Sequence, residues 1–172
     1  GAGTYKVVVK YNESSVNVSV TVKSTVLADD LVKMYKNATK FSAKFTDSTG
    51  KALVNSDVRF NINGVFYTRT TDANGVASLA INLRPGDYIL TAYNPVNGEQ
   101  KGVNITVKSL IVQNDLTKYY LNASRFQATI YNKDGSLAVN KNVTFNINGV
   151  FYIRTTDSNG VVSLAINLRP GD

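Results

Sequence analysis

The chain has 172 residues, a net charge of +7 and 43% hydrophobic residues, and it contains neither cysteine nor histidine. This composition excludes disulfides, His-ligated zinc and every catalytic centre that needs a Cys nucleophile or a His base. The basic residues are dispersed singly, which argues against a nucleic-acid-binding face, and no apolar stretch approaches the roughly 20 residues of a membrane-spanning helix.

The first 23 residues contain two stretches that recur later in the chain. GTYKVVVKYN, which starts at Gly3, is similar to GDYILTAYN, which starts at Gly86, with one residue of slippage. VSVTVKS, which starts at Val18, is similar to VNITVKS, which starts at Val103. Residues 1–23 are therefore predicted to be the last two strands of a preceding repeat.

The middle of the chain alternates apolar and polar residues with a period of two, the pattern of half-buried strands, and its best helix candidate, residues 30–36, is weak. Asn63-Gly64 predicts a tight hairpin, and Asp72–Gly75 predicts a type I turn closed by a left-handed glycine. The predicted core comprises these residues and their partners 85 positions on: Phe41, Ala43, Phe45, Val58, Phe60, Ile62, Leu79, Ile81, Leu83, Ile89, Val103 and Ile105.

The last segment repeats the middle one with an offset of 85 residues. Residues 145–172 differ from residues 60–87 at three positions, and a weaker match extends back to Ser24 and Ser109. Short strands separated by frequent turns predict an antiparallel β-sandwich of about seven strands in each copy.

Two divisions into domains follow from this repeat. In the first, residues 24–108 are a complete repeat and residues 109–172 are a repeat that lacks its last two strands. In the second, the strand pair packs with the body that follows it, and residues 4–87 and 88–172 are two domains. The sequence alone leaves both divisions open.

The chain also resembles a known family of repeats. Residues 50–99, GKALVNSDVRFNINGVFYTRTTDANGVASLAINLRPGDYILTAYNPVNGE, together with residues 30–41 and 102–108, are similar to the Ig-like repeats of adhesin-like surface proteins of methanogenic archaea. The TDxxG turn and the following strand also resemble the Ig-like repeats of bacterial adhesins of the invasin and intimin type. The resemblance implies an all-β fold of tandem immunoglobulin-like antiparallel β-sandwich repeats at the cell surface.

This family resemblance implies a structural role and no catalytic residue. We therefore expect a non-enzymatic stalk repeat, without a cofactor, that spaces a binding tip from the cell and supports attachment between cells or to a host. Neighbouring repeats of the same protein are the expected partners. The alternative is that the repeats themselves bind host or symbiont surface glycans or proteins, weakly and multivalently. An exposed aromatic strip formed by Val65, Phe66 and Tyr67 with Tyr88 and Tyr93 would serve that alternative. The candidate contact residues are Phe66 and Tyr67, with Phe151 and Tyr152 in the second copy.

Asn-x-Ser/Thr sequons are candidate glycosylation sites in an extracellular protein. The main candidates are Asn37 and Asn122, which occupy the same position in both copies, and Asn104 and Asn142. Further sequons begin at Asn12 and Asn17.

Three other groups of residues are candidates for chemical sites. The Asp-x-Asn-Gly motifs that begin at Asp72 and Asp157 lack the glutamate of a full calcium loop, so a turn is the favoured reading. Asp29 and Asp30, with Asp115 in the second copy, are a weak candidate for calcium binding between repeats. Lys33 and Lys118 recur at equivalent positions and are weak candidates for an isopeptide crosslink.

The division into 1–23, 24–108 and 109–172 has a mechanical consequence. A strand pair would stand unpartnered at one end of the chain, and an open sandwich would stand at the other. Because unpaired strand edges recruit strands, this division predicts head-to-tail self-association by strand complementation.

Overall fold

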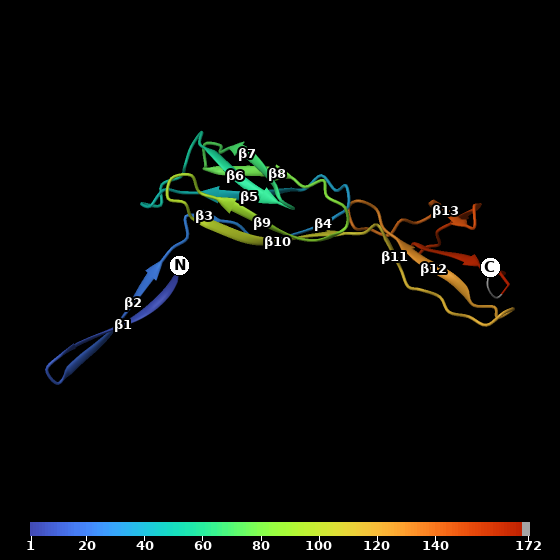
Figure 1. Cartoon of the computed structure of the whole chain (residues 1–172), viewed down its shortest axis with the longest axis horizontal. Coiled ribbons are helices and arrows are strands. Elements are labelled where there is room, and N and C mark those ends of the chain that lie inside the picture. Colours follow the sequence, from blue (N-terminus) through green and yellow to red (C-terminus); the bar gives the residue numbers. More distant parts are fainter. Residues whose placement is uncertain (170–172) are drawn as a thin grey trace. The chain divides into compact units, whose positions relative to one another are not determined.

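A computed structural model of the chain describes residues 1–169, which form strands and turns and no helix (Figure 1). The prediction of an all-β fold built from antiparallel strand pairs is confirmed. Two compact units are present, one made of residues 1–31, 39–81 and 87–105, and the other of residues 32–38, 82–86 and the chain from Thr106 onwards.

The chain begins with an isolated hairpin, drawn in blue in Figure 1. It consists of β1 (Gly3–Tyr11) and β2 (Ser14–Val22), which pair in antiparallel register along their whole length. Every residue of both strands is exposed. Among the described strands, none pairs with either outer edge of this hairpin.

Strands β3 to β10 form two sheets, which we call the first sandwich. One sheet has the order β3-β5-β8 and the other has the order β4-β10-β9-β6-β7. With the strands named A, A′, B, C, C′, E, F and G in chain order, the sheets are A-B-E and A′-G-F-C-C′, an immunoglobulin-like arrangement. The strands are β3 (Val26–Leu27), β4 (Leu31–Met34), β5 (Lys40–Phe45), β6 (Asp57–Ile62), β7 (Val65–Thr70), β8 (Val76–Ala80), β9 (Gly86–Tyr93) and β10 (Gln100–Lys108).

The core of the first sandwich lies between the two sheets. Phe41 of β5 meets Phe60 of β6 edge to face, with ring centroids 5.6 Å apart. Ten of the twelve predicted core residues are buried: Phe41, Ala43, Phe45, Val58, Phe60, Ile62, Leu79, Ile81, Val103 and Ile105.

Two core predictions fail. Ile89 is 68% exposed and the next residue, Leu90, is fully buried instead. Both residues are apolar, so the sequence could not show which of them points inward. Leu83 is half-buried, since it lies beyond the end of β8. The weak helix candidate at residues 30–36 is also wrong, because Leu31–Met34 form strand β4.

The predicted turns form with the backbone angles that their sequences require. Asn63 and Gly64 both have positive φ, 53° and 77°, as a two-residue hairpin turn between β6 and β7 needs. Gly75 has a φ of 76°, and a Cβ atom there would lie 2.7 Å from the carbonyl oxygen of Phe45. The glycine of this turn is therefore required by both its conformation and its surroundings.

The remaining strands form what we call the second body. β11 (Ile111–Gln113), β12 (Arg125–Ile130) and β15 (Val161–Ala165) make one antiparallel sheet, and β13 (Asn142–Ile147) and β14 (Val150–Thr155) make a hairpin. Within the described part of the chain, no strand pairs with the second edge of β13. Counterparts of β9 and β10 would begin at Gly171, outside the described residues.

The core of the second body is less covered than that of the first sandwich. At the predicted partner positions, Ala128 and Leu164 are buried, but Phe126, Ile130, Val143, Phe145, Ile147 and Ile166 are only half-buried and Leu168 is 40% exposed. The prediction that all these partners are core residues is therefore wrong for most of them. In the first sandwich, β9 and β10 supply the buried side chains of Leu90, Ala92, Val103, Ile105 and Val107, and no described residue takes their place in the second body.

Candidate functional site

The predicted aromatic strip contains a compact exposed platform in the first sandwich. The guanidinium of Arg59 on β6 lies over the ring of Phe66 on β7, 4.7 Å from its centroid. It also lies 5.8 Å from the ring centroid of Tyr93 on β9, and the two rings are themselves 5.8 Å apart. Phe66 is 54% exposed, so the platform faces solvent. Tyr93 belongs to the predicted strip, but Arg59 was not predicted, because only the strand register brings it opposite Tyr93.

The other predicted contact residues, Tyr67, Phe151 and Tyr152, do not form a platform of this kind. Tyr67 is half-buried beneath Arg69, whose guanidinium is 5.8 Å from its ring centroid. In the second body Tyr152 packs with Arg154 in the same way, at 5.9 Å, and Phe151 is 69% exposed. The counterpart of Arg59, 85 positions on, is Thr144, so the platform of the first sandwich is not reproduced there.

A partly buried polar cluster anchors the entry of the chain into the first sandwich. One carboxylate oxygen of Glu99 accepts a hydrogen bond from Ser24 Oγ at 2.6 Å, and the other accepts bonds from the backbone N–H and the hydroxyl of Thr25. Asn94, which is 1% exposed, donates to Thr25 Oγ1 at 3.0 Å and to the carbonyl oxygen of Thr46 at 2.9 Å. Burial alone would raise the pKa of Glu99, but the hydrogen bonds from Ser24 and Thr25 and the charge of Lys101 outweigh burial and lower that pKa below its ordinary value.

The sequence offered only an indirect signal for this cluster. Asn94 and Glu99 are the polar ends of the stretch NPVNGE, which forms the turn between β9 and β10. Nothing in the spacing showed that Ser24 and Thr25, about 75 residues earlier, would meet this turn. The arrangement holds a strand in place, and its carboxylate is already saturated by protein donors.

Asp30 holds the next part of the chain against β10. Its carboxylate accepts hydrogen bonds from the backbone N–H of Asn104 at 2.7 Å and from Asn104 Nδ2 at 3.0 Å. The backbone bond from Asn104, followed by the side-chain bond, lowers the pKa of Asp30. Donors that face this carboxylate are N–H groups. Among the described residues, no group of three or more acidic side chains is placed to hold a metal ion.

The Asp-x-Asn-Gly motifs act as turns in both copies. Asp72 Oδ1 accepts bonds from the backbone N–H groups of Asn74 and Val76, at 2.8 and 2.9 Å. Asp157 makes the equivalent bonds to Asn159 and Val161 at the same distances. This is the Asx-turn geometry, in which the aspartate side chain replaces backbone partners.

The four main sequons lie in different surroundings. Asn122 and Asn142 are exposed, and their Oδ1 atoms accept bonds from Ser124 N and Thr155 Oγ1. Asn37 is half-buried. Asn104 is exposed, but its side-chain nitrogen, the atom that would carry a glycan, donates to Asp30.

The two recurring lysines, Lys33 and Lys118, lie in different surroundings. Lys33 is 6% exposed, and burial lowers its pKa. Lys118, its counterpart, donates from Nζ to the backbone carbonyl oxygens of Ser124 and Ile166, each at 2.9 Å. This geometry gives Lys118 a role in joining two chain segments through their carbonyls.

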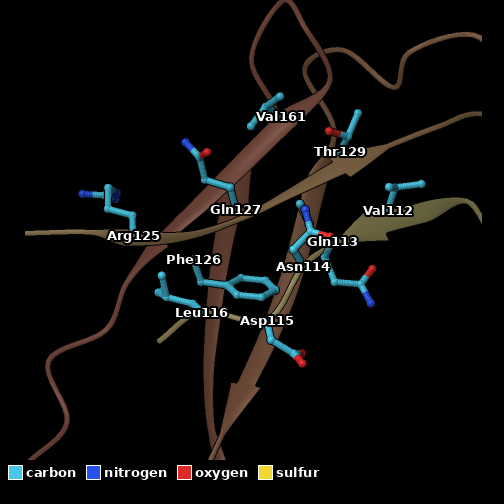
Figure 2. A pocket seen from close by; sticks show the side chains of 11 residues that line it. Val112, Gln113, Asn114, Asp115, Leu116, Arg125, Phe126, Gln127, Thr129 and Val161 are labelled. Carbon is cyan, nitrogen blue, oxygen red and sulfur yellow. The ribbon is translucent and has the colours of Figure 1, made fainter. Parts of the chain in front are cut away.

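Two of the hollows on the second body lie beside its half-covered core. Figure 2 shows the first, of about 330 Å³, where the ring of Phe126 and the carboxylate of Asp115 border a space beside β11 and β12. The second hollow, of about 390 Å³, exposes apolar side chains from β13 and β15, namely Phe145, Ile147 and Leu164. Asp115, Leu116 and Phe126 border both hollows.

Comparisons with known proteins give matches only at the level of structure. The sequence matches no protein-family model and none of the curated proteins. The fibronectin(III)-like modules of Clostridium thermocellum CbhA are 21% identical, with a TM-score of 0.35, over 63% of this chain and 64% of that one. A Ca²⁺-stabilised ice-binding adhesin of an Antarctic bacterium is 21% identical, with a TM-score of 0.29, over 94% of this chain and 48% of that one.

A third similar structure comprises domains 4–9 of the surface layer protein SbsC, at 15% identity and a TM-score of 0.35, over 94% of this chain and 31% of that one. The chain thus spans less than two thirds of each of these three structures. At these scores the superpositions are poor, and the immunoglobulin-like assignment rests on the strand order of the chain itself. Residues 1–169 include no helix that could span a membrane.

Proposed function

We propose that this chain is a structural stalk segment of an extracellular, adhesin-like cell-surface protein, in which each repeat spaces a binding tip from the cell. The observation that carries the proposal is where the chain enters and leaves the first sandwich. It enters at Ser24, which is bonded to Glu99 immediately before β10, and it leaves at Lys108, where β10 ends. Nine residues of extended strand separate these points, which corresponds to about 30 Å.

The way in which β4 meets β10 suits a module that carries tension. Asp30 contacts Asn104, and the backbone N–H of Tyr35 donates to the carbonyl oxygen of Lys108 at 2.9 Å. Both strands therefore run in the same direction, from the entry toward the exit. Tension applied between Ser24 and Lys108 would load the hydrogen bonds of this pair in shear, so that several bonds must break together.

The repeat itself supports the same proposal. Residues 60–87 and 145–172 differ at three positions, which favours one shared structural task over a single specialised site. We propose residues 24–108 as one repeat, because β9 pairs with β6, which precedes it in the chain. Residues 1–23 and 109–172 then belong to neighbouring repeats, and the resemblance to surface adhesins supplies the cellular location.

Single-molecule force spectroscopy on the 172-residue chain tests the proposed mechanical role. Unfolding of the first sandwich should appear as one cooperative event, with a gain in extended length close to that of 85 residues, about 280–310 Å before the folded span is subtracted. Asp30→Ala should lower the unfolding force, because it removes the bonds to Asn104, whereas Asp57→Ala should not. A first sandwich that extends gradually at low force would refute the stalk role. Antibodies against residues 24–108 should label intact cells that make the protein.

A second candidate function has one supporting observation. The exposed platform of Arg59, Phe66 and Tyr93 offers the flat aromatic surface and adjacent cation that sugar rings and many peptides bind. A glycan array probed with the chain tests it. Reproducible binding that Phe66→Ala abolishes and Phe151→Ala leaves intact would favour ligand binding by the repeat.

A further inference from the structure

The platform of the first sandwich holds an arginine without a counter-ion. The guanidinium of Arg59 lies 4.7 and 5.8 Å from the ring centroids of Phe66 and Tyr93, and it forms no hydrogen bond or ion pair with any described residue. Asp57, two residues earlier on β6, accepts a hydrogen bond from Thr70 Oγ1 instead. Contact with a ring uses no hydrogen-bond acceptor, so the five N–H donors of an arginine stay open here to an acceptor from outside.

Two other arginines that lie over tyrosine rings differ in this respect. The guanidinium of Arg69 donates to the carbonyl oxygen of Thr68 at 2.6 Å, and that of Arg154 donates to the carbonyl oxygen of Ile153 at 2.7 Å. Contact with a ring is therefore compatible with a hydrogen bond in this fold. Within the described part of the chain, Arg59 has none.

The strand register surrounds this guanidinium with uncharged side chains. Five of them share the outer face of β7, β6 and β9 with Arg59: Asn61, Phe66, Thr68, Thr91 and Tyr93. They lie together because directly opposite residues of antiparallel strands point to the same side of a sheet. The side chains of Asn61, Thr68 and Thr91 form no hydrogen bond with any residue that the structure describes, so an amide and two hydroxyl groups are also open to a ligand.

The extent of this face suits a small ligand. Neighbouring strands lie about 4.8 Å apart, and residues two positions apart on a strand are separated by about 7 Å. The six side chains therefore project from backbone positions that span about 10 by 7 Å, comparable with one or two sugar rings. Phe66 is 54% exposed, which leaves ring surface for a sugar to pack against.

The groups on this face match those that bind an acidic sugar. The apolar C–H surface of a sugar ring packs on aromatic rings, and its hydroxyl groups pair with amides and hydroxyls. A guanidinium binds a carboxylate through two parallel hydrogen bonds. A polysulfated chain would need several cations, whereas the five neighbours of Arg59 are all uncharged. An extended peptide would add to a strand edge, whereas this surface is a sheet face that offers side chains.

We propose that the platform of Arg59, Phe66 and Tyr93 binds a sugar that carries a carboxylate, namely a uronic acid residue of a glycan. The carboxylate pairs with the guanidinium of Arg59, and the sugar ring packs against Phe66. The sugar hydroxyls pair with the open side chains beside them. This inference rests on ligand binding by the repeat, the second candidate function, and names the class of ligand. The stalk role does not depend on it.

The second body lacks the central group of this site. Thr144 stands at the position of Arg59, although Phe151 there is 69% exposed. The two copies therefore share their structural residues but differ in the group that would hold a carboxylate. Binding should be confined to the first sandwich, and the second body serves as an internal control.

Titration of the chain with trigalacturonic acid, followed by the amide resonances, tests the proposal. Shifts should cluster at residues 59–61, 66–68 and 91–93 and be absent from their counterparts in the second body. The methyl ester of the same trisaccharide keeps the rings and loses the charge, so it should bind about tenfold more weakly. Arg59→Gln should weaken binding of the acid to the level of the ester. Arg69→Gln is the matched control and should leave both affinities unchanged, because Arg69 pairs with Val58 and lies on the opposite face of the sheet.

Three outcomes would overturn the inference in different ways. Equal affinity for the acid and the ester would remove the carboxylate from the proposal and leave sugar binding by the repeat intact. Equal affinity for a hexaglutamate peptide and the acid would show that the ligand is an acidic peptide. If neither saccharide shifts the platform at about 10 mM, the site does not bind uronic acid, and the glycan array then decides whether the repeat binds any sugar. Arg59 is exposed, so its variant should fold, which the melting temperature checks.

Discussion

Phe60 and Phe145 occupy the same position in two nearly identical stretches of sequence, yet their surroundings differ. Phe60 is fully buried and packs against Phe41 and Phe45, whereas Phe145 is half-buried and, among the described aromatic rings, packs against Phe126 alone. The difference comes from β9 and β10, which cover the first sandwich. A core position in this fold is therefore completed by strands that follow it by 25 residues or more.

The same contrast appears at the strand next to β10. Leu31–Met34 form β4, whereas the counterpart segment, residues 116–119, forms no strand, and Tyr119 within it is 88% exposed. β4 exists because β10 gives it backbone partners, and Asp30 adds bonds to Asn104. The local sequences are similar, so the missing neighbour decides the outcome.

Truncation of the two phenylalanines should separate the two copies most strongly. Phe60→Ala should lower the free energy of unfolding of the first sandwich by about 3–5 kcal/mol, the usual effect of removing a fully buried ring. Phe145→Ala should cost less than half of that in dilute solution, because part of its ring already contacts water. Denaturation followed by residue-resolved hydrogen exchange reports on each copy separately. Equal penalties for the two variants would contradict this comparison, because they would mean that the ring of Phe145 is packed as completely as that of Phe60.

The sequence predicted much of this fold and less of its details. The period-two pattern, the Asn63-Gly64 turn and most of the first core could be predicted because each depends on neighbours close in the chain. The inward phase of β9 could not, because Ile89 and Leu90 are both apolar. The contacts of Glu99 with Ser24 and Thr25, and of Arg59 with Tyr93, depend on strand pairing between distant segments, which local patterns do not specify.

Acid should weaken the first sandwich through Glu99. Its pKa is lowered in the folded chain, so the charged carboxylate stabilises the fold above the ordinary value of 4.5, and this contribution is lost as the pH falls through the lowered pKa. Glu99→Gln should therefore flatten the stability profile of the first sandwich below pH 4.5. Near neutral pH it should cost about 1 kcal/mol, since a charged acceptor of several hydrogen bonds is lost from a partly exposed site.

Glu13→Gln is the matched control for this profile, because it makes the same change on the exposed hairpin turn. Melting temperatures measured from pH 7 to pH 3 would show the difference. A parallel shift of both variants would mean that overall charge, rather than the Ser24–Thr25 anchor, controls the response to acid.

The smallest effect is expected where the two copies differ by a single side chain on the surface. Arg59→Thr converts the platform of the first sandwich to the residue that Thr144 provides in the second body. The loss of the guanidinium from Phe66 and Tyr93 should lower stability by about 0.5–1 kcal/mol, the range for cation–π pairs at exposed sites. Thr144→Arg should raise the stability of the second body by less than this amount, since no described residue supplies a counterpart of Tyr93 beside Phe151. If a ligand uses the platform, its affinity should fall in Arg59→Thr by far more than this change in stability explains. If the platform is purely structural, glycan binding should stay at background in the unmodified chain and in both variants, Arg59→Thr and Thr144→Arg.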